Sequence, residues 1–182
     1  MLCFYLFAAF VPLIAQPADP PPSGTVGISI LSIELSSDDK DVAKAARRVL
    51  QEQLRDVFHA RGRYHWVERA DPKMLEQILE ELKFQNSGLV ASEEAKNLGK
   101  LAGIGVFVVV TGDLSVGMFG CNLTLKVRTI DVESSRLMSI YTLQSKGHFR
   151  LDPNKSAEDA IAKAMKAFAN ELSTEPAPKE AS

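Results

Sequence analysis

The chain has 182 residues, a length that suits one compact domain with short tails. Hydrophobic residues make up 46% and charged residues 24%, which are the proportions of an ordinary globular protein rather than of a disordered or membrane-filling one. With 23 acidic and 21 basic side chains, the formal net charge is -2. The chain therefore lacks the basic surplus that is typical of nucleic-acid-binding proteins, and we expect no nucleic-acid partner.

The N-terminal stretch from Met1 to Ala15 carries no charge and consists largely of apolar side chains. As a helix it would reach about 22 Å, which is short of the roughly 30 Å hydrocarbon core of a bilayer. We therefore expect a cleaved signal peptide over residues 1–18, although the Lys or Arg that usually precedes such a run is missing. Residues 19–24 would form a Pro-rich linker, and the protein would be periplasmic, with outer-membrane association as an option. Cys3 would be lost with the signal, so the mature chain could form no internal disulfide.

The first half of the predicted domain reads as strand, helix and strand. Residues 25–35 are rich in β-branched side chains and predict a strand. Asp38 or a nearby serine is expected to cap a long amphipathic helix over residues 42–58, whose apolar side chains recur every three or four positions. Gly62 ends this helix, and residues 64–69 predict a short second strand. This order favours parallel strands joined by a right-handed crossover.

Two more helices are predicted before the middle of the sheet. The first, over residues 71–82, begins with Asp71 and a proline, which is a strong helix start. The second is capped by Ser92 and ends at Gly103. Val106 to Val110 are apolar without alternation, as expected for a strand covered on both faces, so we place this strand at the centre of the sheet.

The last third of the chain predicts a hairpin followed by a helix. Residues 122–132 alternate between apolar and polar side chains, which predicts a strand with one buried face. A turn over 131–135 leads to a returning strand over 136–146, with Met138, Ile140 and Thr142 placed opposite Leu137, Tyr141 and Leu143. A helix begins at residues 154–156, and residues 174–182 form a disordered tail.

Together these elements predict an α/β (α+β) fold for residues 25–173. Its mixed five-stranded sheet has helices packed on it, and the order of elements is β-α-β-α-α-β-β-β-α.

Residues that could carry catalysis or bind a metal show no supporting pattern. The three histidines lack the spacing of a zinc site. The glycines between positions 99 and 105 follow a helix and precede a strand, which is the reverse of a phosphate-binding loop. Cys121 is expected to be a small packing residue, and Asp113 to cap a turn at the end of the central strand. We therefore expect no catalytic residue, no metal and no cofactor.

Several short motifs in this order resemble the curli production assembly component (CsgG-like) family. They are Val67-Glu68-Arg69 at the close of a strand, residues 75–81, residues 98–103, residues 109–112, and Ile130-Asp131-Val132 at the hairpin corner. The resemblance implies a mixed sheet packed against helices, an envelope location and a non-catalytic role. It also implies structural roles for the motif residues Glu68, Arg69, Gly99, Gly103, Gly112 and Asp131.

Pore-forming members of that family add long membrane hairpins to this domain. Each membrane strand needs about 9 to 11 alternating residues. The corresponding links here, residues 113–121 and 149–155, are too short, and neither alternates apolar with polar residues over the required length. The chain thus resembles the periplasmic domain of the family without its pore, and membrane contact is expected only through a partner or an uncleaved N-terminus.

The sequence and the resemblance predict a non-enzymatic envelope protein that acts as a periplasmic protein-binding or assembly module, with self-association as an option. One alternative is a subunit of an outer-membrane secretion channel. Another is an activator of a peptidoglycan synthase, because a related domain occurs in lipoproteins that activate penicillin-binding proteins. An enzyme would need a pocket joining Asp113, Arg69 or a histidine. The candidate binding residues are Lys126 and Arg128, since a charged, alternating strand can meet a partner.

Overall fold

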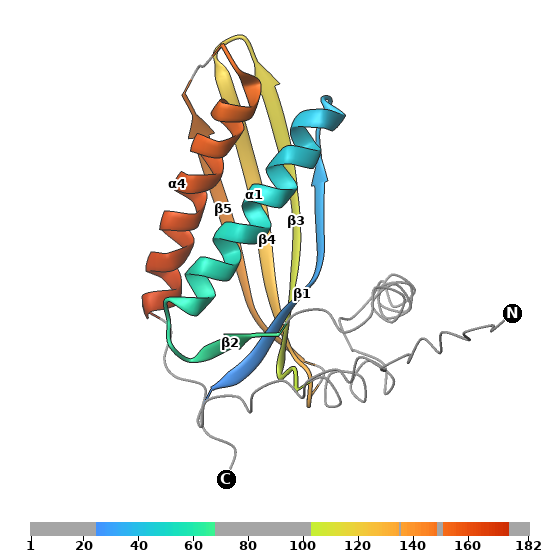
Figure 1. Ribbon diagram of the computed structural model, residues 1–182, viewed down its shortest axis with the longest axis vertical. Helices are drawn as coiled ribbons and strands as arrows, with labels where there is room; N and C mark the ends of the chain where they lie inside the picture. Colours follow the sequence, from blue (N-terminus) through green and yellow to red (C-terminus); the bar gives the residue numbers. More distant parts are fainter. Residues whose placement is uncertain (1–24, 68–102, 135, 149–150, 175–182) are drawn as a thin grey trace, which may run out of the picture.

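The computed structural model describes residues 25–67, 103–134, 136–148 and 151–174 (Figure 1). Its elements are β1 (Val26–Ser36), α1 (Lys40–His59), β2 (Tyr64–Trp66), β3 (Val106–Gly117), β4 (Gly120–Asp131), β5 (Leu137–Gly147) and α4 (Pro153–Thr174). The helices predicted over 71–82 and from Ser92 lie outside the described residues, and so do Glu68, Arg69 and Gly99.

The strands form one mixed sheet in the order β2-β1-β3-β4-β5. β1 is parallel to both β2 and β3, whereas β3, β4 and β5 form an antiparallel meander. The apolar run Val106–Val110 lies in β3, the middle strand, and only Val109 of its five residues is less than fully buried. The predicted mixed five-stranded sheet with helices packed on it is thereby confirmed.

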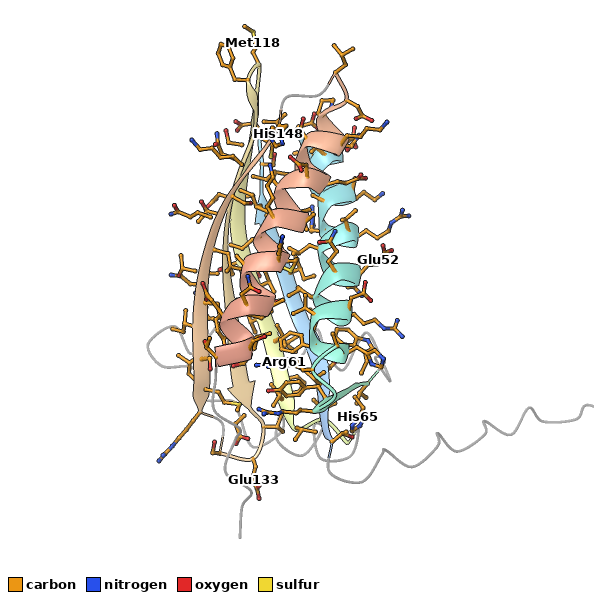
Figure 2. The ribbon with its side chains drawn as sticks, turned by 90° about the vertical axis from the view of Figure 1, so that its left-hand side faces the viewer. Glu52, Arg61, His65, Met118, Glu133 and His148 are labelled. Atoms are coloured by element: carbon orange, nitrogen blue, oxygen red, sulfur yellow. The ribbon has the colours of Figure 1, made fainter. Side chains whose placement is uncertain are left out.

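Both described helices pack on the same face of the sheet (Figure 2). The apolar stripe of α1 contributes Leu50, Leu54 and Phe58 to the core, and that of α4 contributes Phe168. The Phe168 ring meets the Phe58 ring edge-on at 5.6 Å and the Tyr141 ring at 4.9 Å. Such edge-to-face contacts stabilise the pair beyond the burial of area alone, so the two helices and β5 are held to one another at this point.

The cap of α1 is Asp39, one residue beyond the predicted Asp38. The Asp39 carboxylate accepts hydrogen bonds from the backbone N–H groups of Asp41, at 3.0 Å, and Val42, at 3.1 Å. Ser37 supports this cap, because its Oγ accepts a hydrogen bond from the Asp39 N–H at 3.3 Å. The prediction was wrong by one position because two adjacent aspartates can each serve as an N-cap, and only the backbone conformation selects between them.

β3 is longer than predicted, and Asp113 does not cap a turn at its end. The strand continues to Gly117, with Asp113 paired to Thr124 on β4. Beyond Gly112 the sequence changes from a continuous apolar run to alternation, in which Leu114 points inward and Asp113 and Ser115 point outward. Residues 113–121 are therefore two paired strand ends and a tight turn, and the interpretation of this stretch as a short link was wrong.

The alternation predicted for β5 is confirmed from Ile140 to Leu143 and fails only at the start of the strand. Tyr141 and Leu143 face the helices, whereas Ile140 is exposed together with Thr142. The register shifts between Thr129 and Ile130 of β4, where β5 is bulged. A bulge changes which side chains share a face, so Leu137 and Met138 are both exposed instead of alternating.

Candidate protein-binding surface

The face of the sheet opposite α1 and α4 carries no described helix, and its side chains point away from the helices in Figure 2. We call this surface the open face. Because side chains alternate along a strand, the pairing register assigns its members. The members that are not fully buried are Ser32, Glu34 and Ser36 on β1; Val109, Thr111, Asp113 and Ser115 on β3; Asn122, Thr124, Lys126 and Arg128 on β4; and Ile140, Thr142, Gln144 and Lys146 on β5. The same alternation places Phe107 and Ile130 on this face, and both are buried.

Lys126 stands in the middle of this surface. Its neighbours across the strands are Thr111 on β3 and Thr142 on β5, and Glu34 lies one strand further on. Lys126 is exposed, and within the described part of the chain no salt bridge joins it to a carboxylate. Adjacent strands are about 4.8 Å apart, so the threonines flank the ammonium stem without neutralising its charge. The charge of Lys126 is therefore available to a partner.

Arg128 lies two residues along β4 in a more apolar setting. Its cross-strand neighbours are Val109 and Ile140, and its side chain is half-buried. Ile140 is 52% exposed and Met138 is 42% exposed, and both lie near the start of β5. Arginine and methionine are enriched at protein interfaces, where the planar guanidinium combines apolar contact with several donors. Arg128, Ile140 and Met138 together form an apolar and cationic corner of the open face.

β5 closes the sheet on this side, since no described strand pairs with its outer edge. An edge strand with exposed apolar side chains is a template for the addition of another strand. The corner around Arg128 therefore offers a partner both a surface and an edge.

A groove of about 630 Å³ crosses the upper part of the open face. It is lined by Glu34, Thr111, Asp113, Thr124 and Lys126, among others, and also by Arg47 of α1. None of the three histidines lines it. The groove thus brings Asp113 close to Lys126, but it does not join Asp113 to a described histidine, which a catalytic pocket would have required.

His59 and His65 line one pocket of about 470 Å³ together with Asp56, whereas His148 contacts Asp159 on α4. Thr25 Oγ1 lies 3.0 Å from the His65 ring Nδ1. The His148 ring and backbone N–H both contact the Asp159 carboxylate, which also accepts a hydrogen bond from Lys163 Nζ. The His148 N–H and the Lys163 ammonium hold the pKa of the Asp159 carboxyl well below its usual range. In the part of the chain that the structure covers, no three His, Cys, Asp or Glu side chains are grouped as metal ligands would be.

Cys121 is the second residue of β4 and is buried, and burial raises the pKa of its thiol. A thiol in such an environment is neutral and poorly reactive. This setting agrees with a packing residue and gives no support for a nucleophile.

Three of the predicted motif residues are described, and each has a local structural task. Gly103 has φ +69°, a left-handed conformation that favours glycine. A Cβ atom on Gly112 would lie 2.4 Å from the Thr124 carbonyl oxygen. Asp131 Oδ1 accepts hydrogen bonds from the backbone N–H and the Oγ of Ser134, which closes the β4–β5 turn. Their family roles stay predictions.

No protein-family model and no curated protein matches the sequence. Among solved structures, the chain is similar to one described as a "putative neuraminyllactose-binding hemagglutinin homolog" from Helicobacter pylori, with a TM-score of 0.51 and 11% identity over 88% of this chain and 92% of that one. At this identity the likeness shows a shared fold alone.

Two weaker structural matches have similar coverage of the solved chain. A PelC dodecamer from Paraburkholderia phytofirmans has a TM-score of 0.43 and 14% identity, over 80% of this chain and 87% of that one. The LpoB C-terminal domain from Escherichia coli has a TM-score of 0.42 and 13% identity, over 69% and 85%. The CsgG-like resemblance stays a prediction.

Proposed function

We propose that this protein is a non-enzymatic, periplasmic envelope protein that binds another envelope protein through the open face of its sheet. The observation that carries the proposal is the position of Lys126 and Arg128. They occupy successive open-face positions on β4, on a surface that the described helices leave uncovered, beside the exposed side chains of Ile140 and Met138. An uncovered surface that combines cationic and apolar side chains is suited to a protein partner.

Within this surface Arg128 and Lys126 have different expected roles. Arg128 lies between apolar neighbours, so a partner would remove it from water together with Ile140. Arginine in such a desolvated position is a frequent energetic centre of an interface. Lys126 is exposed among threonines, and a charge of that kind mainly affects the rate of association. Arg128 is therefore the anchor of the proposed interface, and Lys126 steers the partner towards it.

The envelope location is supported by the apolar, uncharged stretch from Met1 to Ala15 and by the CsgG-like motifs. None of the described helices is long and apolar enough to cross a bilayer. Two finer versions of the proposal differ in the partner. A subunit of a secretion assembly would bind further copies of itself or channel components, and an activator would raise the rate of a peptidoglycan synthase. Size-exclusion chromatography of the purified protein, followed by a synthase assay, separates these versions.

The proposal is tested by charge reversal on the open face. Arg128→Glu and Lys126→Glu are compared with Lys166→Glu, which reverses an exposed charge on α4, on the opposite side of the sheet. The partner is first isolated from envelope extracts prepared under gentle conditions. Its affinity for each variant is then measured by titration calorimetry. We expect Arg128→Glu to weaken binding by about tenfold or more and Lys166→Glu to leave it unchanged. Equal affinities for wild type and Arg128→Glu, or no specific partner in the extracts, would contradict the proposal.

A further inference from the structure

A second surface lies at the end of the molecule where β3 turns into β4. Gly117 pairs with Gly120, so the turn between the strands consists of Met118 and Phe119 alone. Their side chains are 82% and 93% exposed. Figure 2 shows Met118 at the extreme end of the molecule, beyond the ends of both helices. Two large apolar side chains in water at the tip of a hairpin gain nothing from the fold of this chain.

A third apolar side chain reaches the same end from another segment. β5 ends at Gly147, which pairs with Cys121 just after the turn, and α4 begins at Pro153. Leu151 lies between β5 and α4 and is 97% exposed. Two separate connections therefore present Met118, Phe119 and Leu151 at one end, and we call these three residues the apolar tip.

The acidic start of α1 is set back from Met118 and Phe119, whereas the exposed Asp152 directly follows Leu151. β1 ends at Ser36, which pairs with Asp113, so the β3–β4 hairpin continues four residues beyond it. At about 3.3 Å per residue, the turn projects about 13 Å further than the end of β1, which leads into the acidic start of α1 at Asp38 and Asp39. On a stem of this length Met118 and Phe119 can enter an apolar medium while the carboxylates of Asp38 and Asp39 stay in water.

The shape of the tip favours a lipid surface over a protein partner. The tip is convex, and an alanine Cβ at Gly117 would have no heavy atom within 4 Å among its non-neighbouring residues. A protein would need a matching cavity to cover such a projection, whereas lipid chains adapt to it. The backbone of the stem is already paired between β3 and β4, so little unpaired backbone would enter the bilayer.

From this geometry we propose that Met118, Phe119 and Leu151 insert into the surface of a lipid bilayer. The long axis of the protein then stands perpendicular to the membrane plane. Insertion of a two-residue turn reaches the depth of about 5 to 10 Å that is typical of interfacial anchors. The inference goes beyond the expectation that membrane contact needs a partner or an uncleaved N-terminus. It is independent of the open face, which lies along the sheet and not at its end.

The depth of the tip is measured with tryptophan fluorescence. In the full chain, Trp66→Phe removes the one native tryptophan, and Phe119→Trp places a probe in the tip. The matched control carries Ile140→Trp, an exposed apolar position on β5. Both are mixed with phosphatidylcholine vesicles whose acyl chains are brominated or unmodified. We expect the Trp at position 119 to shift to the blue and to be quenched by bromine, also at raised salt, whereas the Trp at position 140 is not quenched.

Because the readout is local, it reports the depth of the tip even where another segment holds the protein on the vesicle. Absence of quenching at position 119, or equal quenching at both positions, would overturn the proposal. The proposal would also be overturned if the fluorescence of the Trp at position 119 shifted to the blue only when an envelope protein was added and not with lipid vesicles alone.

A second measurement compares two double variants by co-sedimentation with vesicles. One carries Met118→Ser and Phe119→Ser together, and the control carries Leu137→Ser and Met138→Ser together. We expect only the tip variant to lose binding, by about tenfold or more, because each removed side chain gives up its burial in lipid.

Discussion

A Cβ atom on Gly147 would lie 1.9 Å from the backbone carbonyl oxygen of Ser156. The end of β5 and the start of α4 therefore meet backbone to backbone, with no room for a side chain. Ser156 Oγ also donates a hydrogen bond to the His148 carbonyl oxygen at 2.9 Å. This contact holds α4 against the strands that carry Lys126 and Arg128, and it fixes the segment that leads to Leu151.

The first prediction concerns this close approach. Gly147→Ala should lower the free energy of unfolding by about 1 to 3 kcal/mol, because β5 or α4 must move to admit the methyl group. Gly117→Ala is the control, since no neighbouring atom would meet its Cβ. Urea denaturation followed by circular dichroism measures both. Equal midpoints for Gly147→Ala and wild type would show that the approach is looser than the structure indicates.

The second prediction concerns the pH dependence of stability through Asp159. Its pKa is lowered in the folded state, first by the His148 backbone N–H and then by the Lys163 ammonium and the His148 ring. A carboxyl that binds its proton more weakly when folded stabilises the folded state above its unfolded pKa of about 3.9, and this contribution disappears as the pH falls towards the folded value. Asp159→Asn should therefore be less stable than wild type at neutral pH, and the difference should shrink below about pH 4.

Denaturation at a series of pH values tests the role of Asp159, with Glu158→Gln as the matched control on an exposed neighbour. Because water screens these charges, the difference at neutral pH should be small but reproducible. A difference that persists unchanged at acid pH would mean that the variant acts through packing and not through charge.

The third prediction concerns Cys121. Burial protects its thiol and raises its pKa, so the native protein should react with an aromatic disulfide reagent at this position only as fast as it opens. The denatured protein should therefore titrate one more reactive thiol than the native protein. If both forms give the same number of fast-reacting thiols, Cys121 is accessible in the folded state.

The sequence predicts the frame of the fold well because its strongest signals are periodic. The unbroken apolar run Val106–Val110 indicates the central strand, and the alternation around Lys126 and Arg128 places both side chains on a solvent-facing surface. These features depend on the burial of whole strand faces, which a single residue seldom overrides.

Local geometry was less predictable. The bulge that leaves both Leu137 and Met138 exposed follows from a register shift at Thr129, and no residue type in that stretch requires it. The apolar tip does not follow from the sequence prediction, because a strand that ends at Asp113 leaves Met118 and Phe119 in a link, whereas β3 runs to Gly117. The change from a continuous to an alternating pattern at Gly112 was the signal that could have extended the strand.

The most direct test of the account is photo-crosslinking from the two sides of the sheet. A photoreactive amino acid replaces Thr142 on the open face in one variant and Lys166 on α4 in the other, and both are irradiated in envelopes of the host. We predict a specific protein adduct from position 142 that disappears when Arg128→Glu is added, and no such adduct from position 166. Adducts from position 166 alone, or adducts from position 142 that are insensitive to Arg128→Glu, would contradict the assignment of the open face as the binding surface.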